Sequence, residues 1–498
     1  MTHDDPQAPD PREGSSSSGA RSLLERFLGL FADVQPGEGT NIVLLFANIF
    51  LILSAYYVLK VVREGLTIGG VQLFGMGGDE IKAYLPALMA LLLLGVVPAY
   101  GALASRVSRV RLLNTTTLFV MVTLVLFWLW GSAVGVGTAI GLSFYVYLGI
   151  INVFLIAQFW SFTNDIYSEP QGKRLFAIIA LGQSLGAVLG PKIAAYGAGR
   201  IFLLLVVSAG IFGVCLFLYN VLNRRDLARA SSAEPGAASA AQEPLQKGGG
   251  FQLVFQTRYL LLIAVMILIT NVVNTTGEYI LSNAAKSHAE EQVPELDAEL
   301  TRQAQAEAEQ AIRAGETSSL EEALATARAG KLRGARSEVI GRFYGDFFFW
   351  VNLAGLVIQM FFVSRIFKYF GVRAALFVLP VISFGGYAAI GLLGGLAVLR
   401  AAKTAENATD YSLQNTVKQA LFLPTSREAK YKAKAAIDTF FVRFGDAASA
   451  AVVAVGLHVL HFGPRSFAFV NVALVLVWIL LNVGIAREHR KLVPDDQA

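Results

Sequence analysis

The stretch LRAAKTAENATDYSLQNTVKQALF, residues 399–422, begins as an apolar helix candidate yet carries a row of polar and charged side chains. Lys403, Glu406, Asp410 and Gln414 follow at intervals of three or four residues, which puts them on one face of a helix. A charge at the bilayer centre costs about 2.5–3.5 kcal/mol, so this face is expected to line a water-filled cavity that binds a charged solute. A second apolar helix follows a short turn and carries four more ionisable residues: Lys434, Asp438, Arg443 and Asp446.

The composition of the chain is typical of a polytopic membrane protein. Hydrophobic residues make up 55% of the sequence and charged residues 15%, whereas a soluble domain carries about 25% charged residues. The mean hydropathy is +0.55. Apolar runs of about 18 residues or more recur along the chain, and such spans must be helical because the bilayer core offers no water to backbone groups. The sequence therefore predicts an all-α polytopic membrane protein.

Several chemical functions are disfavoured by the residue content. Cys215 is the single cysteine, so neither an intrachain disulfide nor a cysteine-rich metal site can form. The five histidines are scattered without metal-ligand spacing. No nucleophile–base pair, metal cluster or phosphate-binding loop is recognisable. We therefore expect a protein that is not an enzyme, with no metal, no cofactor and no nucleic-acid partner.

The apolar runs divide into two groups. About twelve spans are expected, six on each side of a linker rich in Ala, Ser and Gly. Within the second group, a charged region with helical composition is expected to lie outside the membrane. The predicted segments are a disordered or amphipathic cytosolic N-terminus (1–38), an N-terminal six-helix bundle (39–222), a cytosolic linker (223–258), a C-terminal six-helix bundle (259–486) interrupted by a charged helical insert (287–342), and a cytosolic tail (487–498).

The placement of Lys and Arg predicts the orientation in the membrane. The loops at 105–111, 169–174 and 426–434 are basic, whereas the loop at 131–137 on the opposite side carries no charge. Cytosolic loops are enriched in Lys and Arg. Both termini and the linker are therefore expected in the cytosol, with the insert on the other side.

The two groups of spans also repeat one another. Ser105 and Ser364, each followed by Arg in a basic loop, are 259 residues apart, and Gly186 and Gly445 share that offset. Two six-helix repeats joined by a cytosolic linker are the architecture of the major facilitator superfamily. In that architecture the substrate site lies near the bilayer midplane, between the halves.

Other predicted spans carry polar residues suited to the same cavity. Lys60 and Arg63 share a face of the first helix, and Asn274 and Glu278 share a face of the seventh. Structural explanations compete with a binding role: Lys60 and Arg63 lie near a helix end and could snorkel. The later charges could neutralise one another locally, as the pairs Lys434 with Asp438 and Arg443 with Asp446.

Longer motifs point to a family. They are YYVLKVVREGL (56–66), SEPQGKRLFAIIALGQSLGAVLG (168–190), YGDFFFWVNLAG (344–355) and SLQNTVKQALFLPTSREAKYKAKAAIDTFFVRFGDAASA (412–450). Together they resemble the ATP:ADP antiporter family, the nucleotide transporters of plastids and obligate intracellular bacteria. The resemblance implies twelve helices and nucleotide exchange. It assigns nucleotide contacts to Lys60, Arg63 and the charged positions of helices seven, ten and eleven.

One position departs from the family pattern. The exchangers typically read G-K-S-G-G after the arginine of the eleventh helix, whereas residues 445–449 of this chain read GDAAS. An acid, Asp446, thus stands where a lysine would suit a phosphate. The candidate cations Lys60, Arg63, Lys403 and Arg443 are also matched by as many acids. That balance suits a less highly charged or zwitterionic nucleotide, or another solute.

The residues and the resemblance together predict a secondary transporter of nucleotides. We expect ATP/ADP-type exchange or proton coupling, by alternating access, in the inner membrane of a bacterium. Two alternatives stay open. One is a transporter of the same fold that carries another charged metabolite. The other, from a different class, is a membrane sensor or scaffold that acts through the insert.

Overall fold

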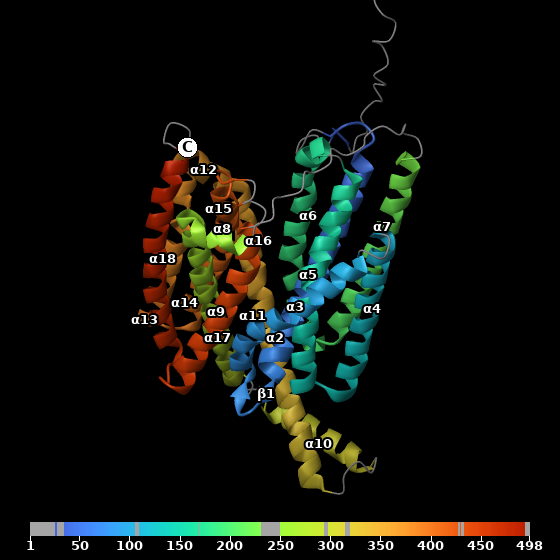
Figure 1. Ribbon diagram of the computed structural model, residues 1–498. Coiled ribbons are helices and arrows are strands. Elements are labelled where there is room, and N and C mark those ends of the chain that lie inside the picture. The colour runs from blue at the N-terminus through green and yellow to red at the C-terminus, as the bar shows by residue number, and fades with distance from the viewer. Residues whose placement is uncertain are drawn as a thin grey trace, which may run out of the picture.

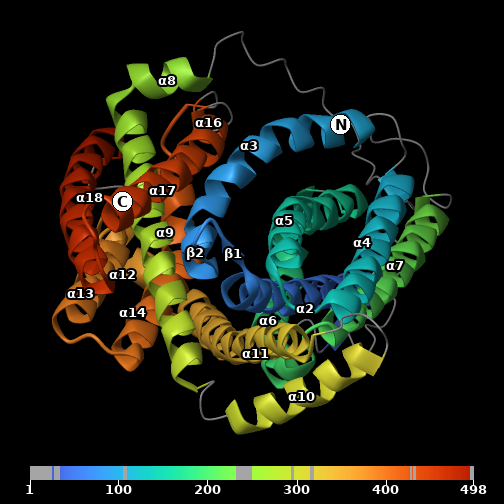
Figure 2. The same cartoon turned by 90° about the horizontal axis from the view of Figure 1, so that it is seen from below.

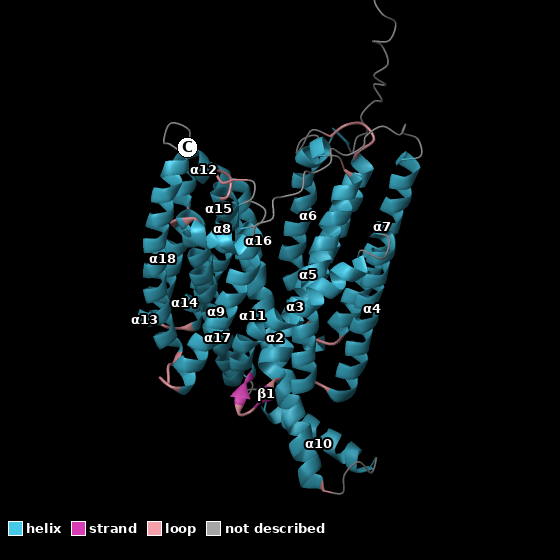
Figure 3. Ribbon diagram, in the orientation of Figure 1, coloured by secondary structure: helices cyan, strands magenta, loops and turns pink. Residues whose placement is uncertain are grey.

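The computed structural model describes residues 25–26, 34–104, 109–167, 169–230, 250–292, 297–313, 319–426, 429 and 433–493. Most of the predicted N-terminal segment 1–38, the middle of the linker and the last five residues lie outside these ranges. Helices make up nearly all of the described chain, and the strands are confined to one hairpin, β1 (Gln72–Leu73) with β2 (Met76–Gly77) (Figure 3).

The first half of the chain forms one group of long helices, drawn blue to green in Figure 1. Their apolar composition over 26 to 32 positions suits long membrane helices, and α3 and α6 continue past internal prolines, Pro86 and Pro98 in α3 and Pro191 in α6. They are α2 (Gly39–Gly70), α3 (Gly78–Ala104), α4 (Arg109–Val134), α5 (Thr138–Ile166), α6 (Glu169–Tyr196) and α7 (Leu203–Ala230).

The second half is more interrupted. A short helix, α8 (Gly250–Gln256), precedes α9 (Arg258–Gln292), and three later helices contain π-helical segments, a feature frequent at functional sites. They are α11 (Leu320–Val357) with η3 (Ile358–Phe362) and α12 (Val363–Ala375); α14 (Leu396–Thr409) with η4 (Asp410–Gln414) and α15 (Asn415–Leu421); and α16 (Lys434–Ala436) with η6 (Ile437–Phe441) and α17 (Val442–His458). The uninterrupted helices are α13 (Val378–Leu392) and α18 (Pro464–Leu492).

Eight helical stretches of the described chain are long and apolar enough to cross a membrane, by length and composition. One of them, Leu320–Ala375, joins α11 to α12. The prediction of an all-helical, multi-pass membrane protein is confirmed. We call the end of the molecule that carries the C-terminus the C-terminal face and the opposite end the α10 face (Figure 1). The ribbons of the two halves converge toward the α10 face and diverge toward the C-terminal face.

The charged insert is built from the extended ends of two long helices and a helix between them. α9 continues past residue 287 to Gln292, and α11 runs from Leu320 through residue 342 into the apolar region, so both predicted bounds, 287 and 342, fall inside continuous helices. Between them, α10 (Asp297–Arg313) lies along α11 on the α10 face (Figures 1 and 2). The buried Ala304, Ala308, Ala323 and Ala327 let α10 and α11 approach closely.

Helices α2 and α6 pack closely because a stripe of glycines faces α2. A Cβ added to Gly182, Gly186 or Gly190 would lie 2.6, 2.3 or 2.5 Å from a backbone carbonyl oxygen of α2. Small residues in a stripe allow this approach of two membrane helices. The packing holds α2, which carries Lys60 and Arg63, at the centre of the molecule (Figure 2).

We expect Gly186→Ala to lower the thermal unfolding temperature of the purified protein, because the new methyl group would overlap the carbonyl oxygen of Phe50. Overpacking of this kind costs about 1–3 kcal/mol. Gly210→Ala in α7 is the matched control, since nothing lies within 4 Å of its added Cβ, and it should leave the unfolding temperature unchanged or slightly raised. Equal temperatures for the two variants would contradict this account of α2–α6 packing.

Candidate functional site

A cavity of about 180 Å³ lies between the two halves and is lined by residues of α2, α3 and α5 from the first half and α9, α11 and η4 from the second. Its wall is unusually rich in charge for a site among apolar helices. The charged lining residues are Lys60, Arg63, Glu64, Asp79, Lys82 and Glu278.

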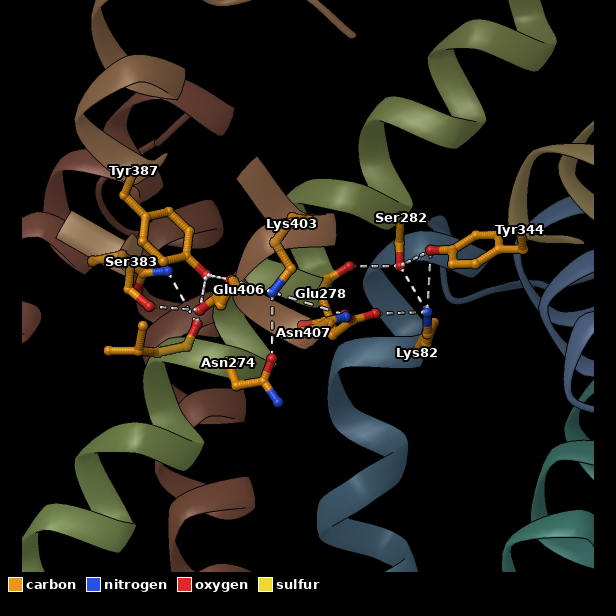
Figure 4. A network of polar contacts seen from close by, with 12 residues as sticks. Lys82, Asn274, Glu278, Ser282, Tyr344, Ser383, Tyr387, Lys403, Glu406 and Asn407 are labelled. Carbon is orange, nitrogen blue, oxygen red and sulfur yellow. Dashed lines mark hydrogen bonds and ion pairs between the residues drawn. The ribbon is translucent and has the colours of Figure 1, made fainter. Parts of the chain in front are cut away.

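A chain of ion pairs crosses this region from one half to the other (Figure 4). Lys82 of α3 contacts Glu64 of α2 (Nζ to Oε2, 2.7 Å) and Glu278 of α9 (3.9 Å). Glu278 also lies 3.8 Å from Lys403 of α14, which pairs with Glu406 at 2.7 Å. A buried charge is tolerated when an opposite charge and hydrogen bonds compensate it, and these five side chains compensate one another in sequence.

Hydrogen bonds hold the second-half end of this chain in place. Tyr387 donates to both carboxylate oxygens of Glu406 at 2.9 and 3.0 Å, and Ser383 donates at 3.4 Å. Lys403, whose side chain is fully buried, donates to Asn274 Oδ1 at 3.3 Å. Asn407 donates to Glu278 at 3.1 Å. Lys403 and Glu406 therefore lie behind the cavity wall and position Glu278 and Asn274 within it.

The first-half end of the chain is held by α2, α3 and α11. Glu64 pairs with its neighbour Arg63 as well as with Lys82. Lys82 donates to Ser282 at 3.0 Å and to Tyr344 at 3.3 Å, so it contacts the second half through three different side chains. These contacts join α3 to α9 and α11.

More contacts between the halves lie toward the α10 face. Asp79 at the start of α3 accepts from Lys286 (2.9 Å) and Asn283 (3.0 Å) of α9. Glu80 lies 2.8 Å from His458 at the end of α17. Together with the Lys82 contacts, these interactions join α3 to α9 and α17 on the α10 side of the cavity.

Lys60 differs from the other cations of the cavity because aromatic rings surround it. Its Nζ lies 4.1 Å from the ring centroid of Phe348, 5.2 Å from that of Tyr57 and 5.9 Å from that of Tyr411. Among the residues the structure describes, no carboxylate lies within ion-pair distance of it. Ring faces attract a cation, so the ammonium group is held over the rings and left available to an anion.

The structure places the sequence-predicted site residues in two groups. Lys60, Arg63, Asn274 and Glu278 line the cavity, and Lys403 and Glu406 support it from behind. The other predicted residues lie outside the cavity lining, and most of them form local ion pairs. The sequence spacing had allowed this structural role for two pairs, Lys434 with Asp438 and Arg443 with Asp446. Asp410 pairs with Lys418 at 3.3 Å, Lys434 with Asp438 at 3.3 Å and Arg443 with Asp446 at 3.2 Å, while Gln414 is buried.

Sequence reasoning missed Lys82, which makes the central contact between the halves. A signal was present: Lys82 is the lone charge in IKAYLPALMALLLLG, residues 81–95, and an isolated lysine in an apolar span requires an explanation. No comparable signal marks Phe348 or Tyr411, because aromatic side chains are common in membrane helices.

We expect Lys82→Met to lower the thermal stability of the purified protein strongly, because it removes a cation that compensates the buried carboxylate of Glu64 and the partly exposed one of Glu278. Removing one partner of a buried pair costs about 3–5 kcal/mol. Adding Glu64→Gln should restore part of the loss. Lys491→Met is the control, since Lys491 is 69% exposed in its pair with Glu488 and such pairs contribute about 0–1 kcal/mol. Equal unfolding temperatures for Lys82→Met and Lys491→Met would show that the buried chain does not stabilise the fold.

Comparisons with solved structures establish the fold. A POT family transporter in complex with 5-aminolevulinic acid matches with a TM-score of 0.57 at 12% identity, over 91% of this chain and 97% of that one. The nucleoside transporter NupG matches with a TM-score of 0.57 at 9% identity, over 89% and 98%. At such low identities the likeness shows the fold alone, and it confirms the predicted major facilitator-type architecture.

Comparisons of sequence indicate the family. The profile of the TLC ATP/ADP transporter family matches residues 143–288 and 397–489. ADP,ATP carrier protein 1 of Chlamydia trachomatis serovar D is 21% identical over 375 residues, and ADP,ATP carrier protein 1 of Chlamydia muridarum is 22% identical over 370. Each match covers 66% of this chain and 61% of the relative. The predicted resemblance is confirmed: two segments that make up just under half of the chain match the TLC ATP/ADP transporter family, a family of transporters rather than enzymes.

Proposed function

We propose that the protein is a secondary transporter of nucleotides that works by alternating access. One observation carries the proposal: the cavity is shared by the two halves and presents Lys60, a cation with ring contacts in place of an ion-pair partner. An ammonium group suits a phosphate, and aromatic faces suit a nucleobase. The family match and the names of the two chlamydial carriers support the same solute class.

Each predicted residue receives a role in this proposal. Lys60 binds a phosphate group, while Arg63, Asn274 and Glu278 line the same cavity and orient the solute. Lys403 and Glu406 hold Glu278 and Asn274. We assign Asp438 and Arg443, whose side chains are 49% and 41% exposed, to the route from the C-terminal face. Asp410, Gln414, Lys434 and Asp446 receive a supporting role, because they are buried or locally paired.

The contacts between the halves suggest which side is closed. Asp79, Glu80 and Lys82 of α3 bind the second half toward the α10 face, while the ribbons diverge toward the C-terminal face (Figure 1). In alternating access the two bundles, 39–222 and 259–486, rock about the central site and residues 223–258 join them. We propose that this structure represents the state closed on the α10 side.

The proposed orientation rests on charge placement. The ends of α7 and α18 on the C-terminal face are rich in Lys and Arg, which favours the cytosolic side (Figure 1). The C-terminal face, both termini and the linker would then be cytosolic, and α10 with the rest of the insert would lie outside. Because the relatives are bacterial carriers, we propose the inner membrane of a bacterium.

We expect Lys60→Met to abolish the rise in unfolding temperature that a bound nucleotide causes in the wild-type protein, since the phosphate loses its cation. A ligand that binds the native state stabilises it by about 2.7 kcal/mol at 100 times its Kd. Lys368→Met is the matched control, because Lys368 also lies over a ring, 5.7 Å from the centroid of Tyr369, but outside the cavity.

Uptake of labelled ATP, ADP and AMP by proteoliposomes, with and without nucleotide inside, would follow transport itself. A folded wild-type protein that neither binds nor transports any nucleotide would refute the proposed function. Transport of a different charged solute would then favour the metabolite alternative, and the absence of any transport would favour the sensor or scaffold.

We expect Asp79→Ala to increase the population that is open on the α10 side, because it removes the bonds to Lys286 and Asn283. Cys215 is the single cysteine, so Thr275→Cys in a Cys215→Ala background gives one thiol in the cavity lining. A membrane-impermeant thiol reagent added outside proteoliposomes of oriented protein should label this thiol faster when Asp79→Ala is present. Unchanged labelling would show that the Asp79 contacts do not keep that side closed.

A further inference from the structure

The charges of the cavity and its ion-pair partners do not quite balance. Positive side chains exceed negative ones by one when the lining residues and their partners are counted together. The basic side chains are Lys60, Arg63, Lys82, Lys286 and Lys403, and the acidic ones are Glu64, Asp79, Glu278 and Glu406.

The excess charge is that of Lys60. Each of the other four cations has a carboxylate within 4.0 Å, and Glu64 and Glu278 are each shared between two cations. One anionic group can therefore bind Lys60 without breaking any ion pair. Each additional phosphate brings further negative charge and competes with the carboxylates for Arg63 or Lys82. A buried partner displaced in this way is left uncompensated, which is unfavourable.

The rings around Lys60 define the neutral part of the solute. Phe348 lies on α11 and Tyr411 on η4, and Tyr411 is 43% exposed. Tyr145 lies beside Arg63, with 4.8 Å between its ring centroid and the guanidinium carbon. An aromatic base can stack on such faces while its phosphate reaches Lys60.

The size of the cavity agrees with a small anionic group. Its volume of about 180 Å³ lies below the roughly 300–1,000 Å³ of pockets that hold drug-sized ligands. In this state the space beside Lys60 accommodates one phosphate with its attached sugar more readily than a chain of three phosphates.

We propose that the site prefers solutes with a single phosphate group on an aromatic base, that is, nucleoside monophosphates over di- and triphosphates. This inference rests on the nucleotide transport proposed above and names its substrate class. We attribute the preference to pairing within the cavity: among the described residues no carboxylate lies within ion-pair distance of Lys60, whereas Arg63, Lys82 and Lys403 each have one.

The test is a ligand series on the full-length wild-type protein in detergent. Dissociation constants for adenosine, AMP, ADP and ATP, and for the matching uridine series, are measured by calorimetry without divalent cations at fixed ionic strength. We expect the monophosphate to bind at least about tenfold more tightly than the triphosphate, a difference of about 1.4 kcal/mol. The nucleoside, which lacks an anion for Lys60, should bind more weakly than the monophosphate.

Two variants test the charge argument directly. Glu278→Gln removes one of the negative charges that compensate Lys82 and Lys403, which leaves these cations more available to additional phosphates. The preference for AMP over ATP should therefore fall to about threefold or less. Lys60→Met should remove the preference for AMP over adenosine. The control is Glu488→Gln on the C-terminal face, where Glu488 pairs with Arg258 and Lys491 far from the cavity lining; it should leave both ratios unchanged.

The outcomes separate the two proposals. Wild-type affinity that rises from AMP to ADP to ATP would overturn the monophosphate preference and leave nucleotide transport standing. A folded protein that binds none of the nucleotides would overturn the proposed function and this inference with it. If Glu278→Gln fails to fold, the wild-type series decides the matter without it.

Discussion

Lys82 joins the two halves of the protein through buried ion pairs, with Glu64 at 2.7 Å on one side and Glu278 at 3.9 Å on the other. A charge among apolar helices is stable only when an opposite charge lies close to it. This constraint limits how α2, α3 and α9 can approach one another. Glu278 also pairs with Lys403, which pairs with Glu406, so the same constraint applies to α14. The centre of the molecule is therefore a row of alternating charges.

The same side chains line the cavity and join the two halves toward the α10 face. Asp79 and Lys82 belong to the cavity wall, and both bond to residues of α9. A solute that changes the charge balance of the wall therefore changes the stability of the contacts between the halves. A ligand shifts a conformational equilibrium by its differential affinity for the two states. Because Asp79 and Lys82 both line the cavity and bond to the second half, a bound solute can have a different affinity for the state in which these bonds are made and the state in which they are broken.

The polar face that predicted the cavity is interrupted in the structure. Lys403 and Glu406 lie before η4. Their spacing of three residues on one helix is enough to allow them to pair. Asp410 opens η4, and Gln414 closes it. A π-helical segment alters the 3.6-residue register on which a shared face depends. Gln414 is buried, and Asp410 pairs with Lys418 at 3.3 Å. Likewise η6 contains Asp438 and lies before Arg443, and each of these two residues pairs locally.

The sequence by itself predicted the membrane class, the all-helical fold and the family resemblance, because hydropathy, periodicity and motifs are properties of neighbouring residues. It also identified Lys60, Arg63, Asn274, Glu278 and Lys403 as candidates, since polar residues in apolar spans stand out. The tertiary structure alone decided which charge pairs with which. Lys82 and Glu278 are 196 positions apart, and packing of α3 against α9 brings them together. That packing also leaves Lys60 among rings instead of beside a carboxylate, a distinction that no local pattern contains.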